Sequence, residues 1–178
     1  MAKFTPEEIL AKVAAGERLE GDELRGAVLS ARDDLSGANL TGANLQFISL
    51  RGSNLSRVDL SGANLILAHL RGANLSEANL RGANLSEANL SEAYLCGANL
   101  PGANLMGANL CRADLWKTNL CEANLCGASL NNIDMRDADL RGAMYDANTK
   151  WSEGFDPAAA GAVLAEQPAG AGTQCRST

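Results

Sequence analysis

The sequence predicts an all-β chain wound into a solenoid, and two regularities lead to this fold class. From Leu35 to Tyr145 every fifth residue is large and apolar, with leucine at 21 of the 23 positions. Two residues earlier stands alanine in 17 cases, and one residue earlier stands asparagine in 13 cases and aspartate in 5. Five residues advance an α-helix by about 500°, which would scatter the leucines around it, and an odd spacing would place them on both faces of a flat strand. The chain must therefore change direction once in every unit.

Each five-residue unit combines a short extended segment with a corner. The alanine and the leucine are two residues apart, so both can point inward from one extended segment. The next two residues are mostly polar or glycine, as in Ser36-Gly37, Arg71-Gly72 and Ser86-Glu87, and such residues suit a turn. Repetition of these units produces a polygonal coil in which each coil buries the apolar face of its neighbour.

The residues of the repeat also carry a family resemblance. Units such as Ala38-Asn39-Leu40-Thr41-Gly42 and Ala73-Asn74-Leu75-Ser76-Glu77 resemble the pentapeptide-repeat family, whose repeat is written A-(D/N)-L-x-x. The resemblance covers 111 of the 178 residues. It implies a right-handed quadrilateral β-helix with four units per coil, so that 23 units make a little under six coils. We assign residues 35–147 to this β-helix.

The N-terminal residues 1–20 predict a short capping helix. Thr5 can cap its first turn, Pro6 suits the first helical position, and Glu8 completes a capping box. We expect the helix to run from Pro6 to about Ala15 and to stop at Gly16. Its apolar stripe can cover the first coil, whose open backbone would otherwise pair with another chain.

Two irregular segments flank the array. Leu35 follows Leu29 after six residues instead of five, so we interpret residues 21–34 as irregular first coil sides with a one-residue bulge near residues 30–33. After Tyr145 the repeat stops, and the segment Trp151-Ser152-Glu153-Gly154-Phe155-Asp156-Pro157 resembles a terminal motif of bacterial, notably cyanobacterial, pentapeptide proteins. We assign residues 148–166 to a C-terminal cap and residues 167–178 to a disordered tail.

The chain offers little for catalysis, so we expect no enzyme, no cofactor and no metal site. The single histidine, His69, lies at an outward position without a cleft, and the glycines match no phosphate-binding loop. The repeated asparagines are interpreted as structural, because short amides bond the nearby backbone at turns. Four cysteines follow a central leucine at spacings that match no zinc site: Cys96, Cys111, Cys121 and Cys126.

We interpret these cysteines as free thiols in a reducing compartment. The N-terminus shows no apolar run of a secretory signal, and no stretch is long enough to span a membrane. The sequence therefore predicts a cytoplasmic protein without a membrane partner.

If one coil takes four units, each side chain stacks on its equivalent four units later, and the array unrolls into four faces. The first face is centred on Leu40, the second on Leu45, the third on Leu50 and the fourth on Leu55, each with its equivalents in the other coils. The second face carries little charge and an apolar cluster that we predict to be an interaction patch. Its members are Phe47, Ile66, Leu67 and Met106. In the alternative interpretation, the N-terminal helix or residues 16–33 fold over this cluster.

The third face carries a secondary basic patch. Its members are Arg51, His69, Arg71 and Arg112. We also expect ion pairs between stacked residues of adjacent coils, namely Arg57–Glu77, Lys117–Asp137 and Glu92–Arg112. Exposed pairs contribute only about 0–1 kcal/mol each, so these pairs fix the register more than the stability.

The sequence favours a non-catalytic rigid solenoid that binds an unidentified protein partner. The alternative is a DNA-mimic modulator of DNA gyrase, an activity that the resemblance brings in and that needs dense negative charge. Residues 31–150 carry 10 basic and 12 acidic residues, which disfavours mimicry, and the chain lacks the central phenylalanines of gyrase-binding members. We expect no direct nucleic-acid binding at a pI near 4.8, and a monomer because both ends are capped.

Overall fold

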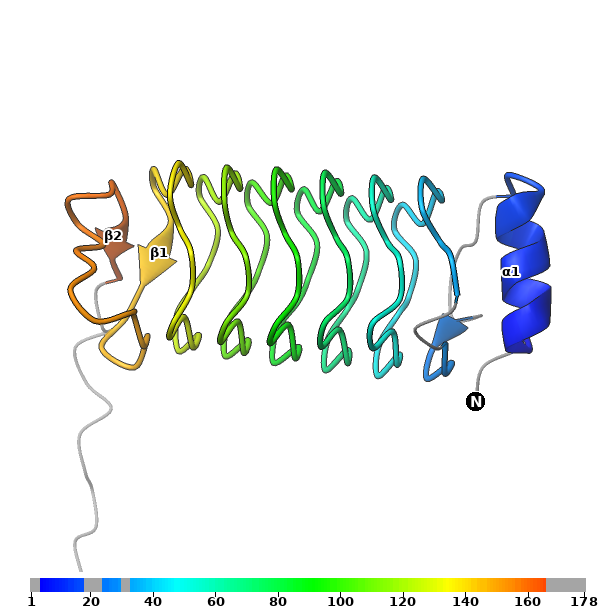
Figure 1. Cartoon of the computed structure of the whole chain (residues 1–178). Helices are drawn as coiled ribbons and strands as arrows, with labels where there is room; N and C mark the ends of the chain where they lie inside the picture. Colours follow the sequence, from blue (N-terminus) through cyan, green and yellow to red (C-terminus); the bar gives the residue numbers. More distant parts are fainter. Residues whose placement is uncertain (1–3, 18–23, 30–32, 166–178) are drawn as a thin grey trace, which may run out of the picture.

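The computed structural model describes residues 4–17, 24–29 and 33–165 of the chain. The described part is a row of stacked coils with one helix at its N-terminal end and a short pair of strands at the other end (Figure 1). The elements are α1 (Pro6–Ala14), β1 (Met144–Tyr145) and β2 (Val163–Leu164). The predicted disordered tail lies outside the described residues, as does most of the segment predicted to hold the bulge.

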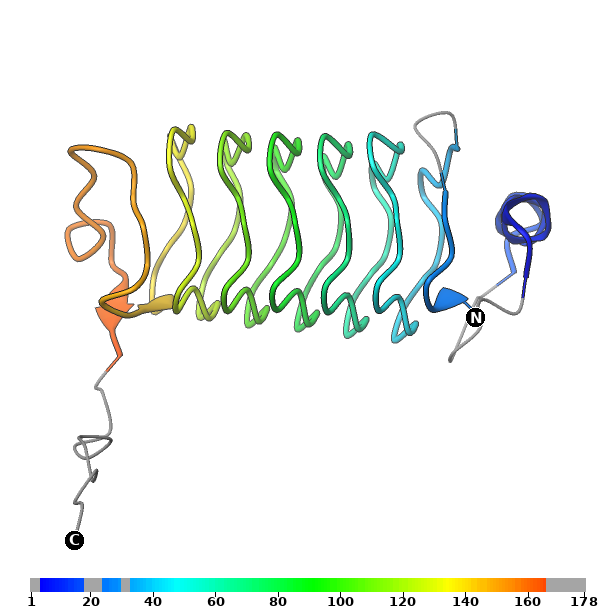
Figure 2. The ribbon, with the colours of Figure 1, turned by 90° about the horizontal axis from the view of Figure 1, so that it is seen from below.

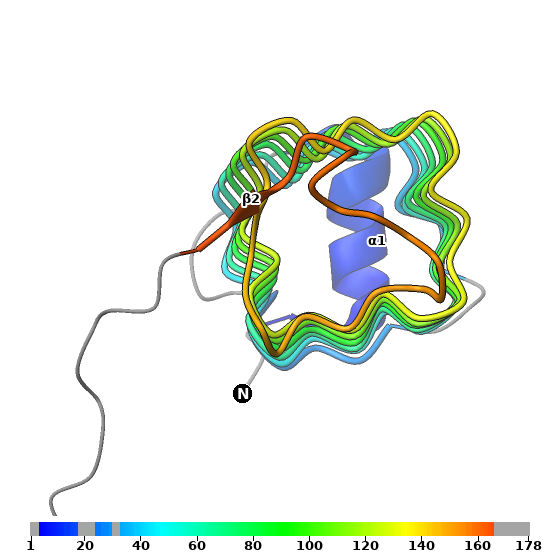
Figure 3. The same cartoon turned by 90° about the vertical axis from the view of Figure 1, so that its left-hand side faces the viewer.

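Along most of the array each residue before a central leucine pairs with its equivalent four units later, so one coil takes four units. Asn79, for example, pairs in parallel with Asp59 on one side and with Asn99 on the other. Leu60 donates its backbone N–H to the Asn79 carbonyl at 2.7 Å, and Asn79 donates to the Val58 carbonyl at 2.9 Å. Viewed along its axis, the coil has four sides (Figure 3). Each side pairs through this one position before the chain turns, so the predicted extended segments are isolated bridges and not long strands.

The corners are tight turns with a left-handed third residue. Ala38 donates its backbone N–H to the Leu35 carbonyl at 3.1 Å, and Gly37 between them has a φ of 66°. A bond of this kind with positive φ at the third residue defines a type II turn, in which glycine is preferred there. In the described array, 11 corner residues other than glycine also adopt positive φ, although the left-handed region costs an L-residue about 1–2 kcal/mol. The non-glycine corners are therefore strained.

Leucine and alanine fill the interior of the coils. Leu65 and Ala63, for example, are fully buried. Asparagine serves the backbone, as predicted: the Asn119 side-chain oxygen accepts the Cys121 backbone N–H at 3.0 Å, and its amide donates to the side chain of Asn99, one coil away, at 2.9 Å. The repeat thus uses one residue type for packing and another for satisfying polar groups at the turn.

The helix α1 lies across the N-terminal end of the row of coils (Figures 1 and 2). Thr5 and Glu8 form the predicted capping box, because each side chain accepts the backbone N–H of the other residue. Ile9 is buried in the apolar core. At the start of the array the pairing register shifts: Val28 pairs with Ser49, whereas Asp34 pairs with Asn54 and the regular array keeps that offset. One additional residue therefore precedes the regular array.

At the C-terminal end an aromatic cluster closes the core. The Trp151 ring lies 5.6 Å from Tyr145 edge-on and 5.2 Å from Phe155 in a stacked arrangement. β2 then pairs in parallel with β1, Met144 opposite Val163. In Figure 3 the orange segment before β2 leaves the outline of the coils and crosses their open end. This segment lies where the C-terminal cap is predicted.

Candidate interaction surfaces

Exposed large apolar side chains gather on the second face of the rod. Of the nine such side chains in the described residues, six lie on this face or on β2, which continues it. These six, which we call the second-face stripe, are Phe47, Leu67, Met106, Met144, Val163 and Leu164. The remaining three are Val28, Tyr94 and Trp116. The stripe extends along the rod from its first complete coil to the C-terminal cap.

The second face carries little charge. In its five units from Ala43 to Gly127, Glu87 is the only charged residue. At the C-terminal end, the Asp146 carboxylate accepts the Gly127 backbone N–H at 2.8 Å, and this bond lowers the pKa of Asp146. An apolar stripe on a nearly uncharged surface is unusual for a protein in water and is typical of a contact surface.

Phe47 and Leu67 occupy strained corners. Their φ angles are 59° and 57°, in the region that favours glycine, and their side chains are 46% and 38% exposed. The predicted stacking is observed, since the Phe47 backbone N–H donates to the Ile66 carbonyl at 3.1 Å. Ile66 itself is half-buried, and Met106 lies two coils beyond Leu67, past the coil of Glu87. The structure therefore brings Phe47 and Leu67 together and separates Met106 from them.

In the alternative interpretation the N-terminal segment covers this cluster, and among the described residues one contact between them is observed. The Arg25 guanidinium lies over the Phe47 ring, 5.5 Å from its centroid. The helix α1 covers the end of the rod and not its side (Figure 1). Phe47 nonetheless keeps nearly half of its surface exposed. Residues 18–23 and 30–32, which belong to the same covering hypothesis, lie outside the described residues.

The basic patch on the third face is weaker than its sequence suggests. Arg51, His69 and Arg112 are exposed, as expected. Arg71, however, pairs with Glu92 at 3.0 Å. The expected Glu92–Arg112 pair is therefore wrong: the Glu92 carboxylate bonds the neighbouring coil on its N-terminal side instead. This pairing removes one of the positive charges that defined the patch.

The expected ion pairs on the fourth face are partly correct. Arg57 and Glu77 bond at 2.8 Å, as predicted. The expected Lys117–Asp137 pair is wrong, because the Trp116 ring intervenes: its indole N–H donates to Asp137 at 3.3 Å, and the Lys117 ammonium lies over the ring, 4.2 Å from its centroid.

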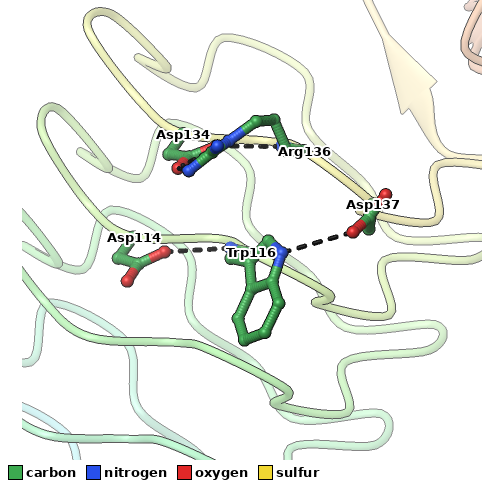
Figure 4. A network of polar contacts seen from close by, with 5 residues as sticks. All are labelled: Asp114, Trp116, Asp134, Arg136 and Asp137. Atoms are coloured by element: carbon green, nitrogen blue, oxygen red, sulfur yellow. Dashed lines mark hydrogen bonds and ion pairs between the residues drawn. The ribbon is translucent and has the colours of Figure 1, made fainter.

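Figure 4 shows the polar contacts around this tryptophan. The Trp116 backbone N–H donates to Asp114 at 3.0 Å, and in the next coil Arg136 bonds Asp134 at 2.6 Å. The Arg136 guanidinium lowers the pKa of Asp134 to about 2. Sequence reasoning missed Trp116 and its exposed neighbour Tyr94, which pairs with Asp114. Phe47 was identified because a large apolar residue replaces a small or polar residue of the repeat. The same signal is present at Trp116 and Tyr94, where an aromatic residue replaces a small polar one.

The described residues also bear on the expectations about metal sites, thiols and membrane helices. They contain no group of three or more His, Cys, Asp or Glu side chains that could hold a metal ion. The four described cysteines are free thiols, and burial raises the pKa of Cys121 and Cys126. Within the same residues, no helix has the length and apolarity needed to cross a membrane.

Comparison with known families gives one match. A family model described as pentapeptide repeats (8 copies) matches four overlapping segments, residues 34–72, 63–102, 73–110 and 103–142. A search of curated proteins found no match.

Among solved structures, a pentapeptide repeat protein of the cyanobacterium Cyanothece 51142 is similar at 35% identity, over 66% of this chain and 90% of that chain, with a TM-score of 0.47. A pentapeptide repeat protein of the Arabidopsis thaliana thylakoid lumen has 38% identity over 64% and 72% of the two chains, with a TM-score of 0.45. QnrB1, a plasmid-mediated fluoroquinolone resistance protein, has 21% identity over 84% and 88% of the two chains, with a TM-score of 0.32.

Proposed function

The chain belongs to the pentapeptide-repeat family, and on that premise we propose that it is a non-catalytic rigid rod that binds a protein partner through the second-face stripe. One observation carries this proposal. Phe47 and Leu67 are large, apolar and exposed at corners whose φ angles favour glycine. Such residues contribute strain and exposed apolar surface without completing the core, and strained residues cluster at binding sites.

A partner for this stripe has apolar side chains spaced along an extended surface. Phe47 and Leu67 lie on successive coils, which are about 4.8 Å apart at the spacing of paired strands, and the remaining members continue the stripe at longer intervals. Large apolar and aromatic side chains are the common anchors of protein interfaces. Glu87 interrupts the stripe between Leu67 and Met106, so the Phe47 end is its strongest part.

The charge distribution gives less support to mimicry of DNA. Several carboxylates are neutralised locally, as in the pairs Arg57–Glu77, Arg136–Asp134 and Arg141–Asp139. A DNA mimic needs roughly one negative charge per 1.7 Å of its axis. We therefore keep gyrase modulation as the weaker proposal, and gyrase supercoiling unchanged by micromolar protein would remove it. We further propose a cytoplasmic monomer, which light scattering and fractionation can test.

The experiment compares two variants in affinity capture from native lysate, followed by direct binding with the captured partner. Phe47→Gly combined with Leu67→Gly removes both side chains and suits the left-handed corners. Arg81→Ser on the first face is the matched control, because it alters an exposed corner outside the stripe. We expect the double variant to bind at least tenfold more weakly and the control to bind normally. Equal binding by the double variant would reject the stripe as the binding surface.

A further inference from the structure

The final coil does not cover the fourth face of the coil before it. In the last regular coil, the chain from Ser129 to Met144 is three five-residue units long. Ser129 pairs with Lys150 and Met144 pairs with Val163 in the final coil, but the chain from Lys150 to Val163 is shorter than three units. The shorter path crosses the end of the rod (Figure 3). As a result, the side formed by residues 133–137 has a neighbour in the preceding coil and, among the described residues, no paired strand beyond it.

This uncovered side presents free backbone groups. In the preceding coil, Leu115 donates its backbone N–H to the Asp134 carbonyl at 2.9 Å, and Lys117 donates to the Arg136 carbonyl at 3.1 Å. The equivalent donors one coil later are the N–H groups of Met135 and Asp137, and neither bonds any described residue. The Ile133 carbonyl is equivalent to the acceptor carbonyls of Ser53, Ala73 and Ala93 in earlier coils, and it also has no backbone donor within the described part of the chain. The edge therefore offers two donors and one acceptor in the register of the array.

The other sides of the last coil are either paired or buried. Leu130 on the third face donates to the Lys150 carbonyl at 2.6 Å, and Ala143 on the second face accepts from Val163 at 2.8 Å. On the first face the Leu140 N–H also bonds no described residue, but Leu140 is only 1% exposed and the following corner is bonded, because Gly142 donates to the Gly161 carbonyl at 2.9 Å. The fourth face differs because Ile133 and Met135 are half-exposed. In the described part of the last coil, this side therefore combines unbonded backbone groups with partly exposed apolar side chains.

A cavity of about 380 Å³ lies over the uncovered edge. Its lining combines the edge with part of the cap: Ile133, Asp134, Met135, Arg136, Ser152, Glu153, Gly154 and Phe155. Ile133, Met135 and Phe155 provide the apolar part of this lining. Arg136 already neutralises Asp134 at 2.6 Å, whereas Glu153 is exposed and has no ion-pair partner among the described residues. The cavity is therefore apolar within and negatively charged at its rim.

We propose that this edge, the fourth-face slot, binds an extended segment of a partner protein as an added strand. The segment has a small residue, a polar residue and a large apolar residue in succession, so that the apolar side chain enters between Met135 and Phe155. The polar residue donates its N–H to the Ile133 carbonyl and accepts the Met135 N–H, as Asp114 does with Ala93 and Leu95 in the paired register. A lysine or arginine in the segment complements Glu153. Added strands bind in this way at exposed sheet edges.

The test uses the full chain and a capped synthetic peptide, Arg-Gly-Ala-Asn-Leu-Ser, which is the sequence of residues 71–76. Nuclear magnetic resonance follows the amide signals of Met135 and Asp137 during titration. We expect both signals to shift and their hydrogen exchange to slow at least tenfold at saturation, while the paired Leu115 amide changes little. A peptide N-methylated at its asparagine cannot donate to Ile133, and we expect it to bind at least tenfold more weakly.

Variants test whether the charge at the rim of the slot contributes to peptide binding and whether the peptide binds elsewhere on the rod. Glu153→Lys should weaken binding of the peptide twofold to fivefold, and the matched control Glu87→Lys on the second face should not. The double variant Phe47→Gly with Leu67→Gly should bind the peptide normally, which distinguishes failure of the slot from failure of the second-face stripe. Shifts confined to second-face residues, or equal binding of the N-methylated peptide, would overturn the proposal.

Two further outcomes also overturn it. If the Met135 and Asp137 amides are already protected from exchange in the dilute chain without peptide, the chain itself fills the slot. If their signals shift with protein concentration alone, the occupant is a second copy of the chain. Support requires that both amides exchange freely in the dilute chain and become protected only with the peptide.

Discussion

Replacing Phe47 and Leu67 by glycine should cost the fold little, and the structure gives the size of the effect. Each replacement relieves about 1–2 kcal/mol of left-handed strain and adds about 0.5–1 kcal/mol of backbone entropy cost. Phe47 is 46% exposed and Leu67 is 38% exposed, so each side chain loses roughly half of the about 1.5–3 kcal/mol that full burial contributes. At the middle of these ranges the three effects nearly cancel, leaving a destabilisation of about 1 kcal/mol or less for the double variant.

A core substitution provides the comparison. Leu65 lies on the same face as Leu67 and is fully buried, and Leu→Ala changes at such positions cost about 2.7–5.0 kcal/mol. At about 2–4 °C of melting temperature per kcal/mol for a chain of this size, the double corner variant should lose less than Leu65→Ala. Differential scanning calorimetry of the two variants and the wild type measures the order.

A double corner variant that loses as much melting temperature as Leu65→Ala would contradict this prediction. That result would mean that Phe47 and Leu67 hold the N-terminal segment, for example through Arg25 on the Phe47 ring, and that the cluster has a structural role. Removing Arg25 then provides the check: Arg25→Ala should reproduce much of the loss in that case and little of it otherwise.

Three further predictions follow from the ends, the carboxylates and the thiols. Thr5→Ala removes the acceptor of the Glu8 backbone N–H and should cost about 1 kcal/mol, seen as a lower melting temperature that Glu7→Gln does not reproduce. Hydrogen bonds lower the pKa of Asp59, Asp134 and Asp146 from the ordinary value of 3.8, and that of Asp134 falls to about 2. The stability that these ionised carboxylates add is present above pH 3.8 and is lost as the pH falls towards 2. The melting temperature should therefore decline over that range, and the decline should be smaller for Asp134→Asn. Burial raises the pKa of Cys121 and Cys126 above the ordinary value of 9.0. Iodoacetamide at pH 8 should therefore label both thiols more slowly in the folded chain than in urea. Mass spectrometry measures the labelling, and faster labelling of the folded chain would contradict this prediction.

The sequence predicted the coil well because packing and turn chemistry act within a few residues. Each five-residue unit contains its own buried pair and its own corner, so the pairing of Asn79 with Asn99, one coil later, follows from the repeat. The start of α1 was predictable for the same reason, because the capping box between Thr5 and Glu8 is a local interaction.

Side-chain partners on the surface were harder to predict. Stacking places Glu92 next to two coils, and the sequence alone does not determine which arginine it bonds; in the structure it bonds Arg71 at 3.0 Å. The Lys117–Asp137 prediction failed because a tryptophan side chain is large enough to reach across to the next coil. Such choices depend on side-chain conformation and not on the repeat.

The uncovered slot could not be predicted because it results from how the chain closes the end of the rod. The cap segment departs from the five-residue period, so no stacking rule places it over a face. Its aromatic residues Trp151 and Phe155 bury themselves over the core, and the shortest path to β2 then bypasses the side of Met135. Packing of the cap against the core determines which side remains open.

The division between regular and irregular positions explains where binding can reside in such a rod. Interior positions such as Leu65 are fully buried, and the asparagine amides are occupied by the backbone and by neighbouring coils, so a substitution at either changes stability before it changes any contact. Corner residues touch little of the core, and the backbone accepts side chains other than glycine there at a cost of about 1–2 kcal/mol. A corner or an open end can therefore acquire a large side chain or a free edge while the coil stays intact. This chain shows both departures from its repeat. Large side chains stand at the corners of Phe47 and Leu67 on one face, and a free edge lies at Met135 on the opposite face.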